Sequence, residues 1–250
     1  MKAFAMGKSD TGLVRELNED SFLISGFEND SPHGFCILAD GMGGHNAGEV
    51  ASAMATEIVS NELLHSDMQG DEEKIVAQIM ASLDYANNEI YHKSVTNSQN
   101  AGMGTTAVVF YLDGETAYIA NIGDSRAYLI EKNGITQLTS DHSIVQKLVE
   151  SGAITPEEAR NHPERNIITK ALGTEPTEEY DIYEFEVREG DRILLCSDGL
   201  TDMLYDEDIK NIVLSQPDPE EALTALVEKA KENGGRDNIT VVLIGISKED

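Results

Sequence analysis

Basic residues are scarce in this 250-residue chain. It has 18 Lys and Arg residues against 46 Asp and Glu residues, which gives a formal net charge of -28 at pH 7. A surface this acidic repels phosphate backbones and anionic lipid, so we expect neither nucleic acid nor a membrane as a partner. The same acidity is compatible with the binding of hard divalent cations.

Cysteine is also rare. Cys36 and Cys196 are the only two, and both lie in apolar stretches typical of strands. Neither belongs to a C-x-x-C pair or has a histidine at zinc-finger spacing, so we expect reduced core cysteines in a cytoplasmic protein. The first residues lack the apolar core of a signal peptide, and no apolar run approaches the ~20 residues of a membrane span.

Low-complexity linkers and repeats of fixed period are absent too, and we expect one domain over residues 1–250. Apolar residues at helical spacing predict two long helices, within 48–64 and 75–90. Stretches rich in β-branched residues predict strands at about 3–8, 21–26, 34–39, within 105–138, and at 180–187, 191–196 and 239–246. The order of strands, two long helices, strands, helices and a last strand favours an α+β fold, with antiparallel sheets and helices layered outside them.

Two short stretches have the chemistry of helix starts. "TPEE" at 155–158 offers Thr155 as N-cap, Pro156 in the first turn and Glu158 for a capping box. "DPEE" at 218–221 repeats the pattern, and its helix is expected to stop at "NGG". A further short helix is predicted around 144–149.

Five aspartates lie where predicted strands meet loops: Asp20, Asp40, Asp124, Asp198 and Asp237. Three of them stand beside glycine, in "ILADGMGG", "IANIGDS" and "ILLCSDG". Any one Asp-Gly pair also fits a turn or a helix cap. A cluster of carboxylates at one end of a sheet would be costly without a cation, whereas Mg²⁺ and Mn²⁺ prefer such oxygen ligands. Glycine lets its carbonyl approach the ion, so the pattern predicts a metal cluster.

Other phosphate-binding and metal-binding motifs do not fit. "GMGTTA" at 102–107 matches G-x-G-x-x-A, but a polar loop precedes it and a strand follows it, the reverse of a dinucleotide-binding turn. The chain has no P-loop lysine and no aspartates at EF-hand spacing. Neither cysteine has an arginine six residues on, which excludes a cysteine-phosphate mechanism.

Taken together, the motifs resemble those of the metal-dependent Ser/Thr protein phosphatases of type 2C, in their bacterial single-domain form. The resemblance covers nearly the whole chain, in the order of the family's motifs: "SDTGLVRELNEDSF" (9–22), "LADGMGGHNAGEVAS" (38–52), "GMGTTAVV" (102–109), "NIGDSRAYL" (121–129), "LTSDHSIVQKLVESGAITPEEARNHPERN" (138–166), "GDRILLCSDGLTD" (190–202) and "GGRDNITVV" (234–242). It implies a four-layer α/β/β/α sandwich with two central antiparallel sheets. It also implies hydrolysis of phosphoserine and phosphothreonine in proteins by a metal-activated water on a binuclear Mn²⁺ or Mg²⁺ centre.

The resemblance carries metal-binding roles onto named residues. Asp40 matches the carboxylate that bridges two ions, and Gly41 gives its carbonyl to one of them. Asp198 and Asp237 match ligands of the other ion. Asp124, with Asp198, matches the site of a third and weaker ion in bacterial members.

Three further residues match roles around those ions. Asp20, with Glu19 beside it, resembles an outer ligand that acts through water. Arg15 matches the arginine that grips the substrate phosphate, because a guanidinium can hold two phosphate oxygens as a fork.

One position departs from the family pattern. Met42 stands where eukaryotic members commonly carry a histidine that is a candidate acid for the leaving alcohol. The general acid is therefore left open between His45, His162 and a metal-bound water.

The resemblance also implies partners and a mobile part. We expect a cytoplasmic monomer that acts on phosphorylated proteins, including an opposing Ser/Thr kinase. The polar segment at about 141–170 is expected to form a flap over the site. Two alternatives stay open: a phosphatase of phosphorylated anti-sigma-type regulators, and a pseudophosphatase that binds phosphoproteins without hydrolysing them.

Overall fold

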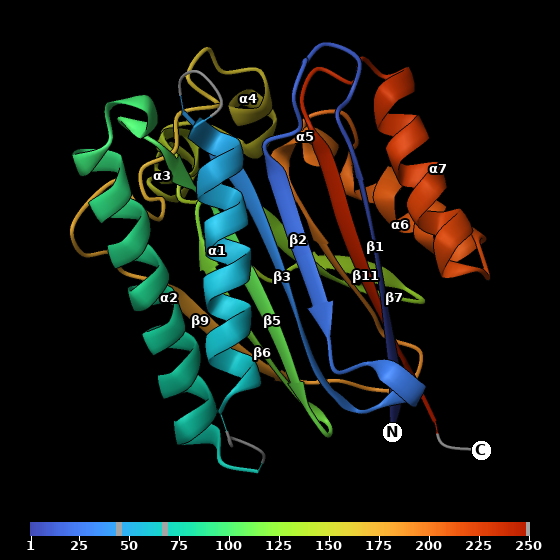
Figure 1. Ribbon diagram of the computed structural model, residues 1–250. Helices are drawn as coiled ribbons and strands as arrows, with labels where there is room; N and C mark the ends of the chain where they lie inside the picture. Colours follow the sequence, from blue (N-terminus) through green and yellow to red (C-terminus); the bar gives the residue numbers. More distant parts are fainter. Residues whose placement is uncertain (44–46, 67–69, 249–250) are drawn as a thin grey trace.

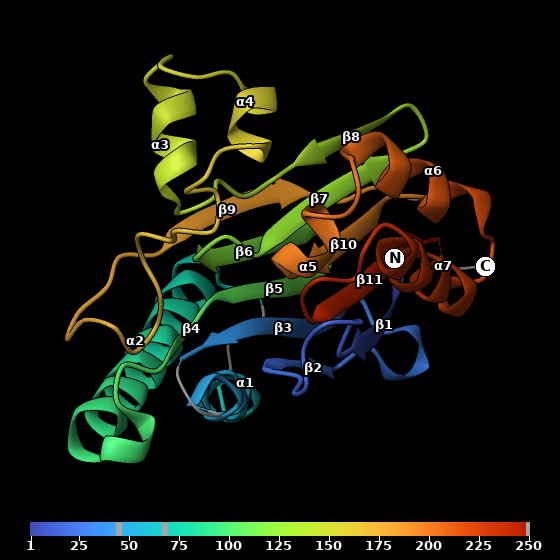
Figure 2. The ribbon, with the colours of Figure 1, turned by 90° about the horizontal axis from the view of Figure 1, so that it is seen from above.

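Two antiparallel sheets pack face to face, with helices on both outer faces (Figure 1, Figure 2). The structure is a computed structural model, and it describes residues 1–43, 47–66 and 70–248. One sheet has the strand order β1-β11-β10-β7-β8 and the other β2-β3-β5-β6-β9, with the short β4 paired to β3. The strands are β1 (Lys2–Asp10), β2 (Asp20–Ser25), β3 (His33–Met42), β4 (Gly104–Thr105), β5 (Ala107–Asp113), β6 (Thr116–Ile122), β7 (Arg126–Glu131), β8 (Gly134–Gln137), β9 (Asp181–Glu186), β10 (Arg192–Cys196) and β11 (Ile239–Ser247).

The helices cover the sheets in two groups. Helices α1 and α2 pack on the β2-β3-β5-β6-β9 sheet, and α6 and α7 lie on the other sheet (Figure 2). The helices are α1 (Ala47–Leu64), α2 (Glu72–Thr96), α3 (Ile144–Glu150), α4 (Pro156–Arg160), α5 (Asp198–Thr201), α6 (Asp206–Ser215) and α7 (Pro219–Glu232).

Alternation along each strand divides the apolar side chains between two faces. In β3, Ile37 belongs to the core beneath α1 and α2, whereas Cys36 and Leu38 belong to the core between the two sheets. A third apolar core lies between the other sheet and helices α6 and α7. Three cores separate four layers, so the predicted α+β class and four-layer α/β/β/α sandwich are confirmed.

The predicted helix starts are present. Thr155 and Glu158 form the capping box of α4, with the Glu158 N–H donating to Thr155 Oγ1 over 3.2 Å. Asp218 caps α7 by accepting from the Glu220 N–H over 2.8 Å. Helices α5 and α6 were not predicted, because the apolar spacing in their short stretches is interrupted by acidic residues.

The sequence predicted that all five aspartates stand where strands meet loops, and for two of them the structure differs. Asp40 is inside β3, which continues to Met42 because Gly41 pairs with Thr105 of β4. Asp198 begins helix α5 and follows Ser197, which separates it from β10. The extra pairing and the short helix come from tertiary packing, which local sequence does not encode.

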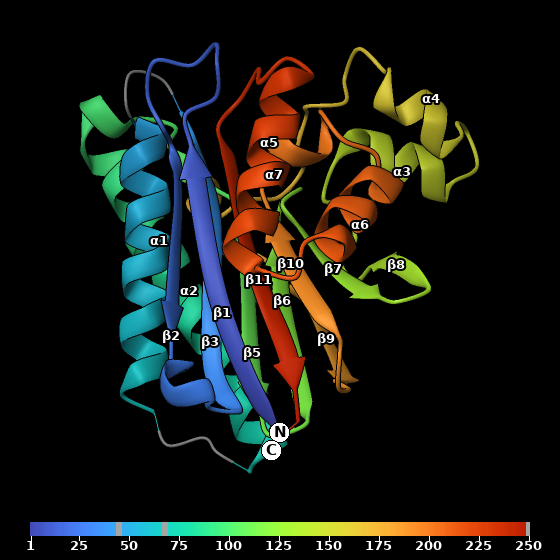
Figure 3. The same cartoon turned by 90° about the vertical axis from the view of Figure 1, so that its right-hand side faces the viewer.

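The turns that carry the aspartates gather at one end of the sandwich. The loop before β2, helix α5, and helices α3 and α4 lie together at that end, and both chain termini lie at the other (Figure 3). In the described ranges, no helix combines the length and the apolar character needed to cross a membrane.

Candidate metal and phosphate site

A cavity of about 290 Å³ opens at the end of the sandwich where the turns gather. It is lined by Arg15, Glu19, Asp40, Gly41, Met42, Gly43, Thr106, Asp124, Asn166, Ile168, Asp198, Asp237 and Asn238. Four of the five aspartates singled out in the sequence therefore share one cavity. These residues come from both sheets and from segments far apart in the chain, from Arg15 to Asn238.

Strand register brings the fifth aspartate beside the others. Asp20 of β2 lies directly opposite Asp40 of β3 in the antiparallel ladder. The Ser197 hydroxyl donates to Asp20 Oδ2 over 2.8 Å, and it accepts from the Thr240 N–H over 3.0 Å. Asp20 Oδ1 is buried and has no hydrogen-bond partner among the described residues. The Asp20 carboxylate is thus held at one oxygen and left with the other oxygen unsatisfied.

The backbone around Asp40 is fixed by two buried threonines. The Asp40 N–H donates to Thr106 Oγ1 over 2.9 Å, and the Thr105 hydroxyl donates to the Asp40 carbonyl over 2.9 Å. Thr106 Oγ1 is also 2.8 Å from Ser125 Oγ, which adjoins Asp124. This hydrogen-bonded chain links strand β3 at Asp40 to the turn that carries Asp124.

The turn before Asp124 depends on a glycine and a histidine. Gly123 has φ +102°, and a Cβ there would lie 2.5 Å from Thr106 Cγ2, so only glycine fits. The Gly123 N–H donates to His142 Nδ1 over 3.1 Å, and His142 Nε2 lies 3.3 Å from Asp181 Oδ2. Because Nδ1 accepts, the proton of the neutral ring is on Nε2, where it faces the Asp181 carboxylate.

Arg15 is paired with a carboxylate of the site. Its Nη2 donates to Asp237 Oδ2 over 2.7 Å, and its Nη1 lies 4.0 Å from Glu19. Asn238, buried beside Asp237, donates to the carbonyls of Thr11 and Leu17 and accepts from the Glu19 N–H. This side chain therefore anchors the loop that carries Arg15 to the start of β11.

The site is crowded with negative charge. Burial, with the charge of nearby carboxylates added to it, raises the pKa of Asp20 to about 6 and that of Asp124 to about 7. Burial and the neighbouring aspartates also hold the pKa of Asp40 and Asp198 well above the usual range. Without a cation, these side chains are protonated at pH values where an ordinary aspartate is ionised.

The donor set suits a hard divalent cation. It consists of carboxylates and the Gly41 carbonyl, and a Cβ at Gly41 would come within 2.1 Å of the Gly48 carbonyl oxygen. Among the described residues, no three carboxylate, imidazole or thiol groups are close enough to hold one ion jointly in this structure. Mg²⁺ and Mn²⁺ keep several waters and use one or two carboxylates each, so the residues fit hydrated ions of this kind.

The structure brings every predicted metal-binding and phosphate-binding residue to this end of the sandwich, whereas the candidate acid His162 does not line the cavity. Met42 lines the cavity, but His162 lines neither this cavity nor its larger neighbour, and its Nδ1 accepts from the Glu164 N–H. His45 falls outside the described residues.

Sequence reasoning passed over the side chains that hold the aspartates in place. Thr106, Ser125, Ser197 and Asn238 are all buried polar residues, and three of them adjoin an aspartate of the site in sequence. That adjacency was a usable signal, because a buried hydroxyl or amide needs a partner. Thr106 carried no such signal, since its partners lie far away in the chain.

The chain matches the family described as "Protein phosphatase 2C" over residues 14–243. It belongs to that family. This phosphatase is 39% identical over 237 residues to "Serine/threonine phosphatase stp" of Listeria monocytogenes, a match that covers 95% of this chain and 93% of the relative. The family and the similarity over nearly the full chain identify it as an enzyme, a serine/threonine phosphatase of the bacterial type.

Solved structures agree in fold with this phosphatase. The Mycobacterium tuberculosis serine/threonine phosphatase PstP/Ppp superposes with a TM-score of 0.89 at 39% identity, covering 99% of this chain and 100% of that one. The catalytic domain of PstP in complex with two manganese ions superposes with a TM-score of 0.86 at 37% identity, covering 99% of each chain.

Proposed function

We propose that this phosphatase hydrolyses phosphoserine and phosphothreonine in proteins with two Mn²⁺ or Mg²⁺ ions held at the aspartate cavity. The observation that carries the proposal is the convergence of five aspartates, Gly41 and Arg15 on one end of the sandwich. The manganese ions in the related PstP catalytic domain support the choice of cation.

Each residue has a proposed place around the ions. Asp40 would hold both ions and Gly41 would give its carbonyl to one, while Asp198 and Asp237 would hold the other. Asp20, whose Oδ1 lacks a partner, acts through water with Glu19 nearby. Asp124, with Asp198, holds a third and weaker ion.

In this proposal, Arg15 and Asp237 separate when metal and substrate bind: Asp237 then binds an ion and Arg15 binds the substrate phosphate. In the structure they bind each other over 2.7 Å, so Asp237 is neutralised by a guanidinium. If Asp237 held an ion in place of Arg15, the guanidinium of Arg15 would be free to bind a phosphate in the same cavity. When bound, the ions supply the electrophilic chemistry, because they make water a nucleophile near neutral pH and offset charge on the phosphoryl oxygens. Met42 has no proton to give and His162 does not line the cavity, so we propose that water protonates the leaving alkoxide, with His45 as the alternative.

The same proposal includes the organisation and the partners. The chain forms one catalytic domain, in which the 141–170 segment, with helices α3 and α4, is a flap beside the site. It acts as a cytoplasmic monomer on phosphorylated proteins, and an opposing Ser/Thr kinase is among them.

Hydrolysis of p-nitrophenyl phosphate and of a phosphothreonine peptide tests the function directly. Both substrates should be turned over with added Mn²⁺, and turnover should stop when a chelator removes the ion. A protein that binds the peptide under these conditions without releasing phosphate would be a pseudophosphatase and would contradict the proposal.

Arg15→Ala is expected to weaken substrate binding without weakening metal binding. Loss of the fork should raise KM or lower kcat/KM by about tenfold to a hundredfold, the size expected for a charge-assisted phosphate contact. Mn²⁺ should bind at least as tightly as before, because Asp237 no longer has an arginine to displace. Steady-state kinetics and a Mn²⁺ titration measure the two effects.

Arg15→Lys is the matched control for this variant, since it keeps the charge and removes the fork. It should recover only part of the lost kcat/KM. Weaker Mn²⁺ binding with unchanged substrate kinetics would show that Arg15 serves the metal site.

A further inference from the structure

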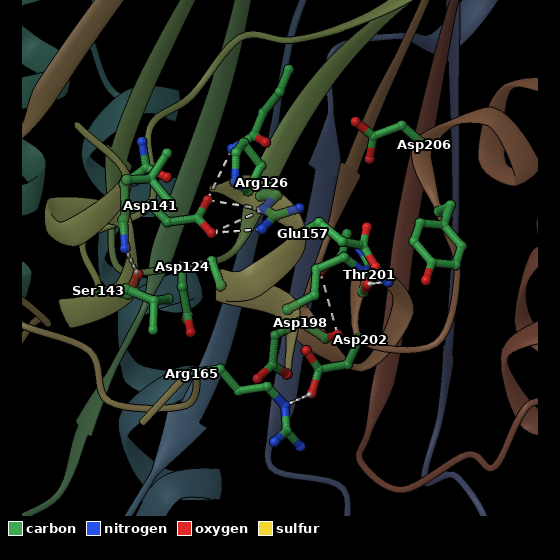
Figure 4. Close-up of a pocket in the computed structure, with 18 of the residues that line it drawn as sticks. Asp124, Arg126, Asp141, Ser143, Glu157, Arg165, Asp198, Thr201, Asp202 and Asp206 are labelled. Carbon is green, nitrogen blue, oxygen red and sulfur yellow. Dashed lines mark hydrogen bonds and ion pairs between the residues drawn. The ribbon is translucent and has the colours of Figure 1, made fainter. Parts of the chain in front are cut away.

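A second and larger cavity adjoins the site, and apart from Asp124 and Asp198 its lining has no role in the proposed mechanism. It encloses about 580 Å³ beneath helices α3 and α4, and its opposite walls are β7, β8, α5 and the start of α6 (Figure 4). Asp124, Asn166 and Asp198 line both cavities. A polypeptide whose phosphate lies in the smaller cavity therefore has its neighbouring residues within reach of the larger one.

The arginines of the large cavity are already bound to protein groups. Arg126 donates three hydrogen bonds of 2.7 to 3.1 Å to Asp141. Arg160 donates to the carbonyls of Thr201 and Leu204, and Arg165 Nε lies 3.7 Å from Asp202. Because each of the three guanidinium groups is paired with a protein group, the cavity favours an anion less than its three arginines suggest.

Besides the proposed metal ligands Asp124 and Asp198, two carboxylates on opposite walls of the cavity lack a cationic partner among the described residues. Glu157 of α4 and Asp206 of α6 both line the cavity, and neither forms an ion pair within the ranges that the structure describes. Asp206 accepts only the Tyr128 hydroxyl, over 3.2 Å. Their neighbour Glu207 is different, because it is paired with Lys210.

Part of the lining is apolar. Val145 and Val149 of α3, Pro156 and Ala159 of α4, and the ring of Tyr205 lie among polar side chains that include Gln137, Ser143, Gln146 and Thr201. A lysine or arginine side chain would match a lining of apolar side chains and unpaired carboxylates, because it has an apolar stem and a charged head.

We propose that the cavity beneath α3 and α4 binds a lysine or arginine side chain of the phosphoprotein substrate, with Glu157 and Asp206 facing its charge. This subsite rests on the proposed phosphatase function. It makes the enzyme select phosphorylated residues that have a basic residue nearby in the sequence. The selection is electrostatic, and salt should weaken it.

A set of phosphothreonine peptides tests the subsite. Each peptide carries one arginine, placed at a different position between about four residues before and about four residues after the phosphothreonine. The reference peptide has glutamine at all of these positions. In the wild-type enzyme with Mn²⁺, arginine at one position or two adjacent positions should raise kcat/KM about fivefold to tenfold over the glutamine peptide, mainly through KM. The ratio should shrink in about 0.5 M NaCl.

Variants then locate the effect. Glu157→Gln, Asp206→Asn and the double variant are compared by the ratio of kcat/KM between the arginine and glutamine peptides, so a loss shared by both peptides cancels. The ratio should fall toward one in the double variant. It should persist in Glu164→Gln, which removes an exposed carboxylate of the same segment that does not line the cavity. Circular dichroism confirms that each variant is folded.

The outcomes separate the two proposals. If wild-type enzyme with Mn²⁺ hydrolyses neither the peptides nor p-nitrophenyl phosphate, the proposed function is wrong. If both substrates are hydrolysed and arginine has no effect at any position, the subsite is wrong while the function stands. An arginine preference that survives the double variant would also overturn the subsite, because it would originate elsewhere.

Discussion

Asp40→Ala and Asp198→Ala should each abolish nearly all Mn²⁺-dependent turnover while leaving the protein folded. Asp40 is proposed to bridge both ions, and Asp198 lies between the two cavities, where it is proposed to hold one ion and share a third. Loss of such a ligand should lower kcat by at least about a hundredfold, which corresponds to about 2.7 kcal/mol of transition-state stabilisation. Phosphatase assays over a range of Mn²⁺ concentrations measure the effect.

A matched control tests whether loss of any carboxylate, or only of one in the site, lowers turnover. Glu131→Ala removes an exposed carboxylate from the end of β7 that is farthest from Arg126 and the site, and it should leave turnover unchanged. Circular dichroism is recorded for each variant. A folded Asp40→Ala or Asp198→Ala enzyme that keeps more than about a tenth of wild-type turnover would contradict the assignment, since a tenfold loss is only about 1.4 kcal/mol.

The free energy of unfolding of the metal-free protein should fall as the pH rises from about 4 to about 7, because the buried aspartates of the site ionise in this range. Burial raises the pKa of Asp20 from 3.8 to about 6 and that of Asp124 to about 7. Between 3.8 and those values the folded state binds more protons than the unfolded state, so the free energy of unfolding falls with pH. For Asp20 alone this amounts to about 2–3 kcal/mol once the pH exceeds about 6.

Urea unfolding with a chelator at pH values from about 4 to 8 measures this dependence. Because other groups also titrate, the informative quantity is the difference between wild type and Asp124→Asn, which removes one titrating carboxyl. The metal-free variant should be the more stable protein above pH ~7, by about 1–3 kcal/mol, and the difference should vanish near pH 4. Added Mn²⁺ should reverse the order, since the ion stabilises the folded state of the protein that binds it better. A difference that does not change with pH would rule out titration as its cause.

Local features of the sequence predicted much of the fold. The apolar run of β11 is buried along all but its last residue, as a strand between two layers requires. The capping residues Thr155 and Asp218 begin their helices where the sequence placed them. These features depend on residues close together in the sequence, so they can be predicted without knowledge of the tertiary structure.

Sequence by itself determined the identity of the candidate site residues and the family. Aspartates beside glycine at strand borders, in a fixed order of motifs, were sufficient to name Asp40, Asp124 and Asp198 and to predict a divalent cation. Tertiary structure alone decided how they meet. Strand register sets Asp20 opposite Asp40, which is 20 positions away in the chain. An ion pair joins Arg15 to Asp237, which is 222 positions away, and one cavity is lined by both Glu157 and helix α6. Such contacts depend on strand pairing and layer packing, which are properties of the whole fold and have no local signal in the chain.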